Sequence, residues 1–182
     1  MSGHNKWSKI KHRKASEDAK KSKLFSNLVR SITVESKKAG GDINNPSLKA
    51  IIDKAKSVNM PSTNIEKAVK KGTGSEADNL EEVSYEAYGS EGCALLILGI
   101  TDNKNRTTSE IKHLLSTHNS KLGEQGSVMW AFEKLPDNKW QAINYLDLSE
   151  TGLKQLINLI DELEEHDDVD EVLVNVKTED NE

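Results

Sequence analysis

The chain has 182 residues, of which 35% are hydrophobic, 30% are charged and only 4% are aromatic, so a folded core must be built mainly from aliphatic side chains. Its one cysteine, Cys93, excludes an internal disulfide and any site made from paired cysteines. No apolar stretch approaches the roughly 18 residues of a membrane-spanning helix, and the N-terminus is charged from Lys6 onward, so we expect a cytoplasmic protein without a signal peptide.

Opposite charges divide the sequence into two parts. Residues 1–74 contain 17 Lys and Arg against 6 Asp and Glu, whereas residues 75–182 contain 8 against 24. Mixed signs on every surface would serve solubility equally well, so this opposition predicts two domains with different electrostatic roles. We expect a basic domain over 1–74, a linker over 75–80, an acidic domain over 81–178 and a short tail over 179–182.

Three helices are predicted in the basic domain. The first, over 16–39, has apolar residues at helical spacing and is ended by two glycines. Asn45 is a typical N-cap and is followed by a proline, which predicts a second helix over 46–58. A third helix is expected to open on a capping box, in which Thr63 and Glu66 bond to each other's backbone.

The first helix is predicted to have one apolar and one cationic face. On a helical wheel the apolar face is formed by Leu24, Phe25, Leu28, Val29 and Ile32. Directly opposite lie Lys23, Arg30 and Lys37, which form a cationic ridge flanked by Lys20 and Lys38. Lys21 falls on the apolar side and does not fit this pattern.

The densest basic cluster precedes the first helix. Between Gly3 and Lys14 the chain has five lysines and arginines and no acid, so this arm is too polar to bury and suits a phosphate backbone. Trp7 could stack on an unpaired base or hold the arm against its own domain, and His12 could contact a phosphate or be a bystander. The residues expected to contact nucleic acid are Lys6, Trp7, Lys9, Lys11, His12, Arg13, Lys14, Lys20, Lys23, Arg30 and Lys37.

In the acidic domain the hydrophobic period changes towards two. Alternation over 83–88, a glycine-containing turn and an apolar run over 93–100 predict a hairpin with a buried second strand. A helix is expected from about Asp102. Strands over 126–133 and 140–146 follow, joined by a turn that contains the third proline of the chain.

A last helix from about Ser149 and a strand over 169–176 complete the acidic domain. From Cys93 the order is βαββαβ, the ferredoxin-like pattern in which two helices cover one face of a four-stranded antiparallel sheet. We therefore predict an α+β protein: an N-terminal three-helix domain, followed by a ferredoxin-like βαββαβ domain with an extra N-terminal hairpin strand.

The acidic domain offers no recognisable catalytic arrangement. Carboxylates between Glu162 and Asp170 are ligands that a metal-dependent nuclease needs, but adjacent positions point in different directions and no partner motif exists. We interpret this run as a solvated helix end that serves a partner surface or repels nucleic acid. Cys93 and Ser127 lack the surroundings of a nucleophile, and phosphate-binding glycine loops are absent. We expect no enzyme, cofactor, metal or small-molecule substrate.

Several short motifs in the right order resemble one family. They are Gly3–Trp7, Ile10–Lys14, Asp53–Lys56, Asn59–Pro61, Asn64–Ala68, Lys70–Gly74 and Thr101–Thr107. Together they resemble the YebC/PmpR family, which also includes a mitochondrial translational activator. The resemblance extends from the arm to about Glu133 and resumes from about Trp140 to Val176.

This resemblance implies a helical N-terminal domain and two α/β domains, the third inserted within the second. Between Lys134 and Trp140 the chain has only a short turn where the family usually inserts that domain, so it resembles a two-domain form. Asn5 also stands where the family has a small hydroxyl residue. Family members are described as DNA-binding transcriptional regulators, and others resemble ribosome-associated factors that relieve stalls at proline-rich stretches.

Three functions are open at this point. The first is a non-enzymatic, DNA-binding transcriptional regulator that uses the arm and the ridge on phosphates. The second is a translation factor on ribosomal RNA, and the third is a protein-interaction module whose acidic domain binds a basic partner. The residues do not separate DNA from RNA, because backbone contacts dominate and no base-reading set is visible.

Overall fold

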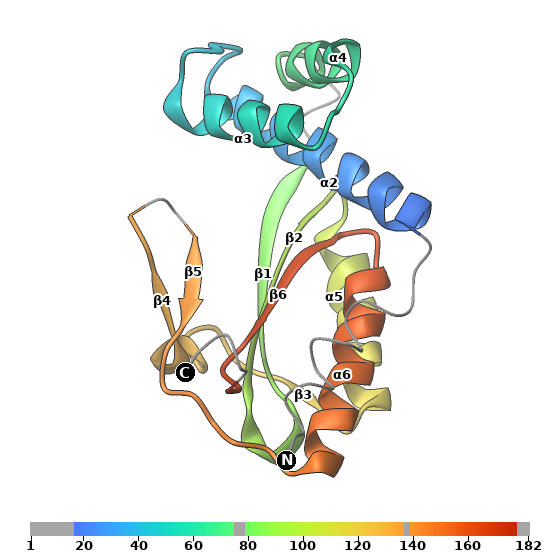
Figure 1. The fold of residues 1–182 in the computed structure, drawn as a ribbon, viewed down its shortest axis with the longest axis vertical. Helices are drawn as coiled ribbons and strands as arrows, with labels where there is room; N and C mark the ends of the chain where they lie inside the picture. Colours follow the sequence, from blue (N-terminus) through green and yellow to red (C-terminus); the bar gives the residue numbers. More distant parts are fainter. Residues whose placement is uncertain (1–16, 75–78, 137–138, 178–182) are drawn as a thin grey trace. The chain divides into compact units, whose positions relative to one another are not determined.

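The computed structural model describes residues 17–74, 79–136 and 139–177, which divide into two compact units (Figure 1). The helical unit holds the described residues up to Glu82 together with Ile100–Lys104, and the sheet unit holds the others. The arm and most of the expected linker lie outside the described residues, so the linker boundaries stay a prediction.

Three helices build the helical unit, as predicted. They are α2 (Glu17–Lys38), α3 (Pro46–Ser57) and α4 (Ser62–Gly72). Asn45 caps α3, because its side-chain oxygen accepts a hydrogen bond from the backbone of Ser47 at 3.0 Å. The capping box at Thr63 and Glu66 is wrong: the N-cap of α4 is Pro61, two residues before Thr63, and Thr63 is already inside the helix.

The core of the helical unit lies where α2 packs on the other two helices. Its buried side chains are Leu28, Ile32, Leu48, Ile52, Ala55, Met60, Ile65 and Ala68. Two hydroxyls of α2 bond to carbonyls of α4: Thr33 donates to Ala68 at 3.4 Å and Ser36 donates to Val69 at 2.7 Å. These bonds keep the two helices close, and Gly72 leaves room for Ser36.

Two residues in the first turns of α2 have surroundings that the helical wheel did not predict. Leu24, expected on the apolar face, is 38% exposed, so the core begins one turn later at Leu28. Lys21, which did not fit the apolar side, has its Nζ 5.6 Å from the centre of the Phe25 ring. The lysine therefore covers an aromatic face while its charge stays exposed.

The sheet unit contains a four-stranded sheet in the order β3-β1-β2-β6. These strands are β3 (Lys121–Leu122), β1 (Glu81–Tyr88), β2 (Ala94–Thr101) and β6 (Val169–Val174). Helices α5 (Lys104–Thr117) and α6 (Glu150–Glu165) cover one face, and the short sheet of β4 (Phe132–Lys134) and β5 (Trp140–Ala142) lies on the other (Figure 1).

The predicted α+β class is confirmed, but the origin of two sheet strands is corrected. Residues 126–131 are loop and a 3₁₀ helix, η3 (Met129–Ala131), and the strand expected over 126–133 shrinks to β4. Among the described strands, β4 pairs only with β5. β5 is shorter than the strand expected over 140–146, since it ends at Ala142. The extra hairpin strand, β1, occupies an inner position of the main sheet instead.

The apolar run of β2 is explained by burial on both faces. Leu95 and Ile97 belong to the core beneath α5 and α6. Ala94 and Leu96 point the other way and pack against Phe132 and the side chains around it. A strand covered on both sides needs apolar residues at every position, so alternation is lost.

The pairing of β2 with β6 shifts in register between Leu98 and Gly99. A Cβ atom on Gly99 would clash with the backbone carbonyl of Asp168. We predict that Gly99→Ala lowers the free energy of unfolding by about 1–3 kcal/mol, since backbone cannot yield as a side chain can. Urea denaturation measures the change, and Gly74→Ala is the control because its Cβ makes only ordinary contacts. Equal stability of both variants would contradict the close approach.

The turn between β1 and β2 holds Ser149, the N-cap of helix α6. The carboxylate of Glu91 accepts hydrogen bonds from the backbone N–H of Ser149 at 3.1 Å and from its hydroxyl, while the Ser149 oxygen accepts from Gly152 at 3.1 Å. Both bonds favour the ionised carboxylate, and they lower the pKa of Glu91 below its ordinary value of 4.5.

Because the folded-state pKa of Glu91 is lowered, its contribution to stability is complete above pH 4.5 and is lost as the pH falls through the lowered value. We predict that the difference in free energy of unfolding between wild type and Glu91→Gln is constant near neutral pH and shrinks below pH 4.5. Urea titrations at several pH values test this, with Glu81→Gln as an exposed control. A difference that grows on acidification would contradict it.

Candidate nucleic-acid interface

Four of the residues expected to contact nucleic acid are described, and all are on α2. Lys20 and Lys37 are exposed, whereas Lys23 and Arg30 are half-buried. The other expected contacts lie outside the described residues; they are Lys6, Trp7, Lys9, Lys11, His12, Arg13 and Lys14.

The ridge on α2 is interrupted at Arg30. The guanidinium of Arg30 donates a hydrogen bond to the backbone carbonyl of Ile100 at 3.3 Å. Val34, one helical turn further on, is only 5% exposed. This part of α2 is therefore covered, and the exposed cations of the helix lie towards its two ends, at Lys20 and Lys21 and at Lys37 and Lys38.

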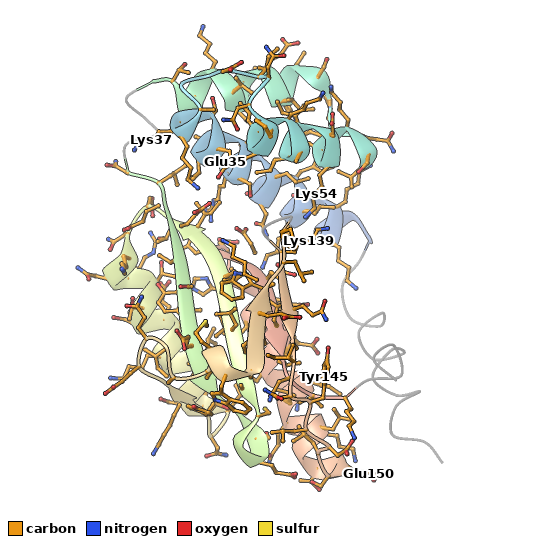
Figure 2. All side chains as sticks on the ribbon, turned by 90° about the vertical axis from the view of Figure 1, so that its left-hand side faces the viewer. Glu35, Lys37, Lys54, Lys139, Tyr145 and Glu150 are labelled. Carbon is orange, nitrogen blue, oxygen red and sulfur yellow. The ribbon has the colours of Figure 1, made fainter. Side chains whose placement is uncertain are left out.

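On α3 and α4, six exposed lysines were not among the expected contacts. They are Lys49, Lys54 and Lys56 on α3, and Lys67, Lys70 and Lys71 on α4. Figure 2 shows Lys37 and Lys54 projecting from two different helices of this unit. The signal was present in the sequence, because these lysines fall between the buried positions of each helix.

One lysine of α2 has its charge matched within the helical unit. Lys38 Nζ lies 2.6 Å from Glu35 Oε1 and 2.8 Å from Glu82 Oε1. Partial burial lowers the pKa of Lys38, but the hydrogen bonds to both carboxylates outweigh this and raise it overall. Lys38 is thus a charged member of a three-residue ion-pair network, and a phosphate would have to compete with two carboxylates for it.

The residues considered for catalysis have no nucleophilic arrangement among the described residues. Cys93 is completely buried, and burial raises the pKa of its thiol to about 11, which keeps it protonated and unreactive at neutral pH. The Ser127 hydroxyl is buried without a hydrogen-bond partner. His118 Nε2 lies 3.1 Å from the exposed Glu162, which makes an ion pair or hydrogen bond between α5 and α6.

The interpretation of the acidic run as a solvated helix end is wrong for Asp168, which is only 3% exposed. Its Oδ2 accepts hydrogen bonds from Arg106 at 2.6 Å and from Thr107 at 2.7 Å. The Asp168 N–H donates to His166 Nδ1 at 3.1 Å, and His166 Nε2 lies 2.9 Å from Glu110 Oε2. Sequence analysis did not predict this network, because Arg106 lies 62 residues from Asp168 along the chain.

Glu110, His166 and Asp168 have ligand atoms close enough together to consider a metal ion. The hydrogen bonds argue against that use. Asp168 Oδ2 is shared by a guanidinium and a hydroxyl, and the His166 ring has a backbone N–H at one nitrogen and a carboxylate at the other. A cation would have to displace Arg106, so the group is best described as a structural network that ties α5 to the turn between α6 and β6.

No helix within residues 17–74, 79–136 and 139–177 combines the length and the hydrophobicity needed to cross a bilayer.

Two family models match the sequence. The TACO1/YebC protein N-terminal domain matches residues 5–75, and the TACO1/YebC second and third domain matches residues 80–136. The second match ends in the turn between β4 and β5, where the family resemblance places an inserted domain.

Relatives that carry the name probable transcriptional regulatory protein are similar to this chain. The protein from Thermosipho africanus is 55% identical over 136 residues, which cover 74% of this chain and 54% of the relative. The protein from Fervidobacterium nodosum is 46% identical over 171 residues, covering 93% of this chain and 68% of the relative. The chain thus spans about half the length of the first relative and about two thirds of the second.

A crystal structure of a conserved hypothetical protein from Aquifex aeolicus has the same fold. It is 32% identical with a TM-score of 0.82, and the match covers 93% of this chain and 95% of that one. Sequence matches to both family models and this structural likeness agree, and the chain belongs to the TACO1/YebC family.

Proposed function

We propose that this protein is a cytoplasmic, non-enzymatic regulator of gene expression that binds DNA through the cations of its N-terminal part. The name of its relatives, probable transcriptional regulatory protein, supports the regulatory role. The binding surface consists of the arm cations and the exposed lysines of α2, α3 and α4.

The charge distribution carries this proposal. The first 74 residues have 17 cations against 6 acids, and the rest of the chain has the opposite excess. Such a surface gains affinity by releasing the counterions condensed on a polyanion, without reading bases. The acid-rich part repels the same polyanion, so it orients the protein with the helical unit towards the nucleic acid.

Two alternatives differ from this function in measurable ways. A factor acting on ribosomal RNA would bind ribosomes tightly and DNA only weakly at the same salt concentration. A protein-interaction module would bind no nucleic acid above background. If about six phosphates are contacted, affinity falls on the order of 10³-fold between about 50 and 200 mM salt. Equilibrium titrations with duplex DNA, structured RNA and ribosomes at several salt concentrations separate the three.

Charge reversal at the exposed ends of α2 tests which surface is used. We predict that Lys20→Glu combined with Lys37→Glu weakens DNA binding at least tenfold and reduces the slope of log affinity against log salt by about 2. Filter binding measures both quantities. Reversal at Lys112 and Lys154 is the matched control, because both are exposed lysines of the sheet unit and the net change in charge is identical.

Equal weakening by both double variants would mean that overall charge, and not the helical unit, determines binding. Unchanged affinity of the Lys20 and Lys37 variant would remove α2 from the interface and leave the arm as the candidate surface. Urea unfolding of each variant is measured in parallel, so that loss of binding is separated from loss of structure.

A further inference from the structure

The C-terminal ends of α2 and α4 lie against each other within the helical unit. Ser36 of α2 donates to the carbonyl of Val69 at 2.7 Å, and a Cβ atom on Gly72 would lie 2.5 Å from the Cβ of Ser36. The segments that follow the two helices also touch, since a Cβ atom on Gly41 would lie 2.7 Å from Cγ2 of Thr73. The helices therefore run in the same general direction and end side by side.

Three exposed lysines lie on one side of this crossing. Successive residues of a helix are turned by about 100°, so Lys37, directly after Ser36, and Lys71, directly before Gly72, both flank the contact. For two helices that run in the same direction, the position after the contact on one helix and the position before it on the other face the same side. Lys67 lies one turn before Lys71 and shares its face.

The carboxylates of the two helices near the crossing lie on the opposite side. Glu35 comes directly before the contact residue of α2 and pairs with Lys38, with 2.6 Å between Oε1 and Nζ. Glu66 of α4 lies one turn before Lys70 and shares the face of that lysine. Near the crossing, the side that holds the three lysines thus contains no carboxylate from the described residues of α2 and α4.

The lysines of α3 have different surroundings. Lys49, Asp53 and Lys56 recur at helical spacing and share one face of α3. Lys56 Nζ lies 3.9 Å from Asp53 Oδ1, so a carboxylate stands among the cations of that face. Attraction of a phosphate depends on the sum of the nearby charges, so the mixed face of α3 attracts it less strongly than the lysines at the crossing.

We propose that Lys37, Lys67 and Lys71 form a lysine clamp that holds one stretch of the phosphate backbone of the bound nucleic acid. This rests on the proposed function and narrows its surface, because the lysines of α3 and Lys38 are assigned no phosphate contact. Closely packed helices lie about 8–10 Å apart, so the crossing brings charges from two helices to neighbouring positions. The helices that carry them are already packed, and their backbone needs no ordering when the ligand binds.

Neutral substitutions distinguish the clamp from α3. We expect Lys67→Gln combined with Lys71→Gln to weaken binding of the full chain to a labelled DNA duplex about tenfold and to reduce the slope of log affinity against log salt by about 2. Lys54→Gln combined with Lys56→Gln is the matched control, because both pairs are exposed lysines of the helical unit and lose the same charge. We expect the control to change affinity by less than about twofold.

A double-mutant cycle tests whether the two helices hold the same phosphates. Lys37→Gln and Lys71→Gln are measured singly and together on the same duplex. If both lysines contact one stretch of backbone, the combined loss differs from the product of the single losses by about threefold or more. Independent charges on a general cationic surface would give single losses that multiply. An RNA hairpin is titrated in parallel, and the same pattern is expected on each probe that the wild type binds.

The outcomes separate this inference from the proposed function. Wild type that binds neither probe contradicts the proposed function itself. Wild-type binding with equal losses in the two double variants, with a larger loss in the α3 variant, or with single losses that multiply overturns the clamp alone. A loss of affinity in Lys67→Arg combined with Lys71→Arg, which keeps both charges, also overturns it. Urea unfolding of every variant separates loss of binding from loss of structure.

Discussion

Burial of β2 on both faces is the constraint on which the sheet unit depends. One face is covered by α5 and α6, and the other requires a second cover, which η3, β4 and β5 supply. That cover has little regular structure of its own, so it is held by long-range bonds, above all by the buried carboxylate of Glu86. The segment that bears Trp130 is a consequence of the same arrangement, because it closes the apolar face of a strand without joining the sheet.

The sequence predicted the elements whose causes are local. The three helices, the Asn45 cap, helix α6 after Ser149 and strand β6 follow from periodicity and capping residues within one element. Prediction failed where contacts with residues far away in the sequence determine the local backbone structure. Val128, Met129 and Trp130 suit a strand by composition, but bonds from Glu86, some 40 residues earlier, hold this segment as a loop. Pro61 likewise starts α4 before the expected capping box can form.

The cations of the candidate interface were identified by composition, but their surroundings were not. A wheel places Arg30 opposite the core of α2, yet it cannot show that a backbone carbonyl 70 residues away accepts from its guanidinium. The same limit applies to Asp168. The run of acidic residues around it predicts a solvent-exposed side chain, whereas in the structure it is buried and accepts a hydrogen bond from Arg106. Charge counts therefore predict the sign of a surface well, whereas the role of a single charged residue depends on which neighbours the tertiary structure brings to it.

The turn that joins β4 to β5 has an evolutionary consequence. Its ends are already brought together by the hydrogen bond from Leu135 N–H to the carbonyl of Lys139 at 2.8 Å, and the hairpin stands outside the main sheet. Lengthening a connection whose ends are fixed adds only a slowly growing entropic penalty. An entire domain can therefore be inserted or deleted at this position while the packing on either side stays the same. The hairpin is a site at which longer and shorter proteins with this fold can differ by a whole domain.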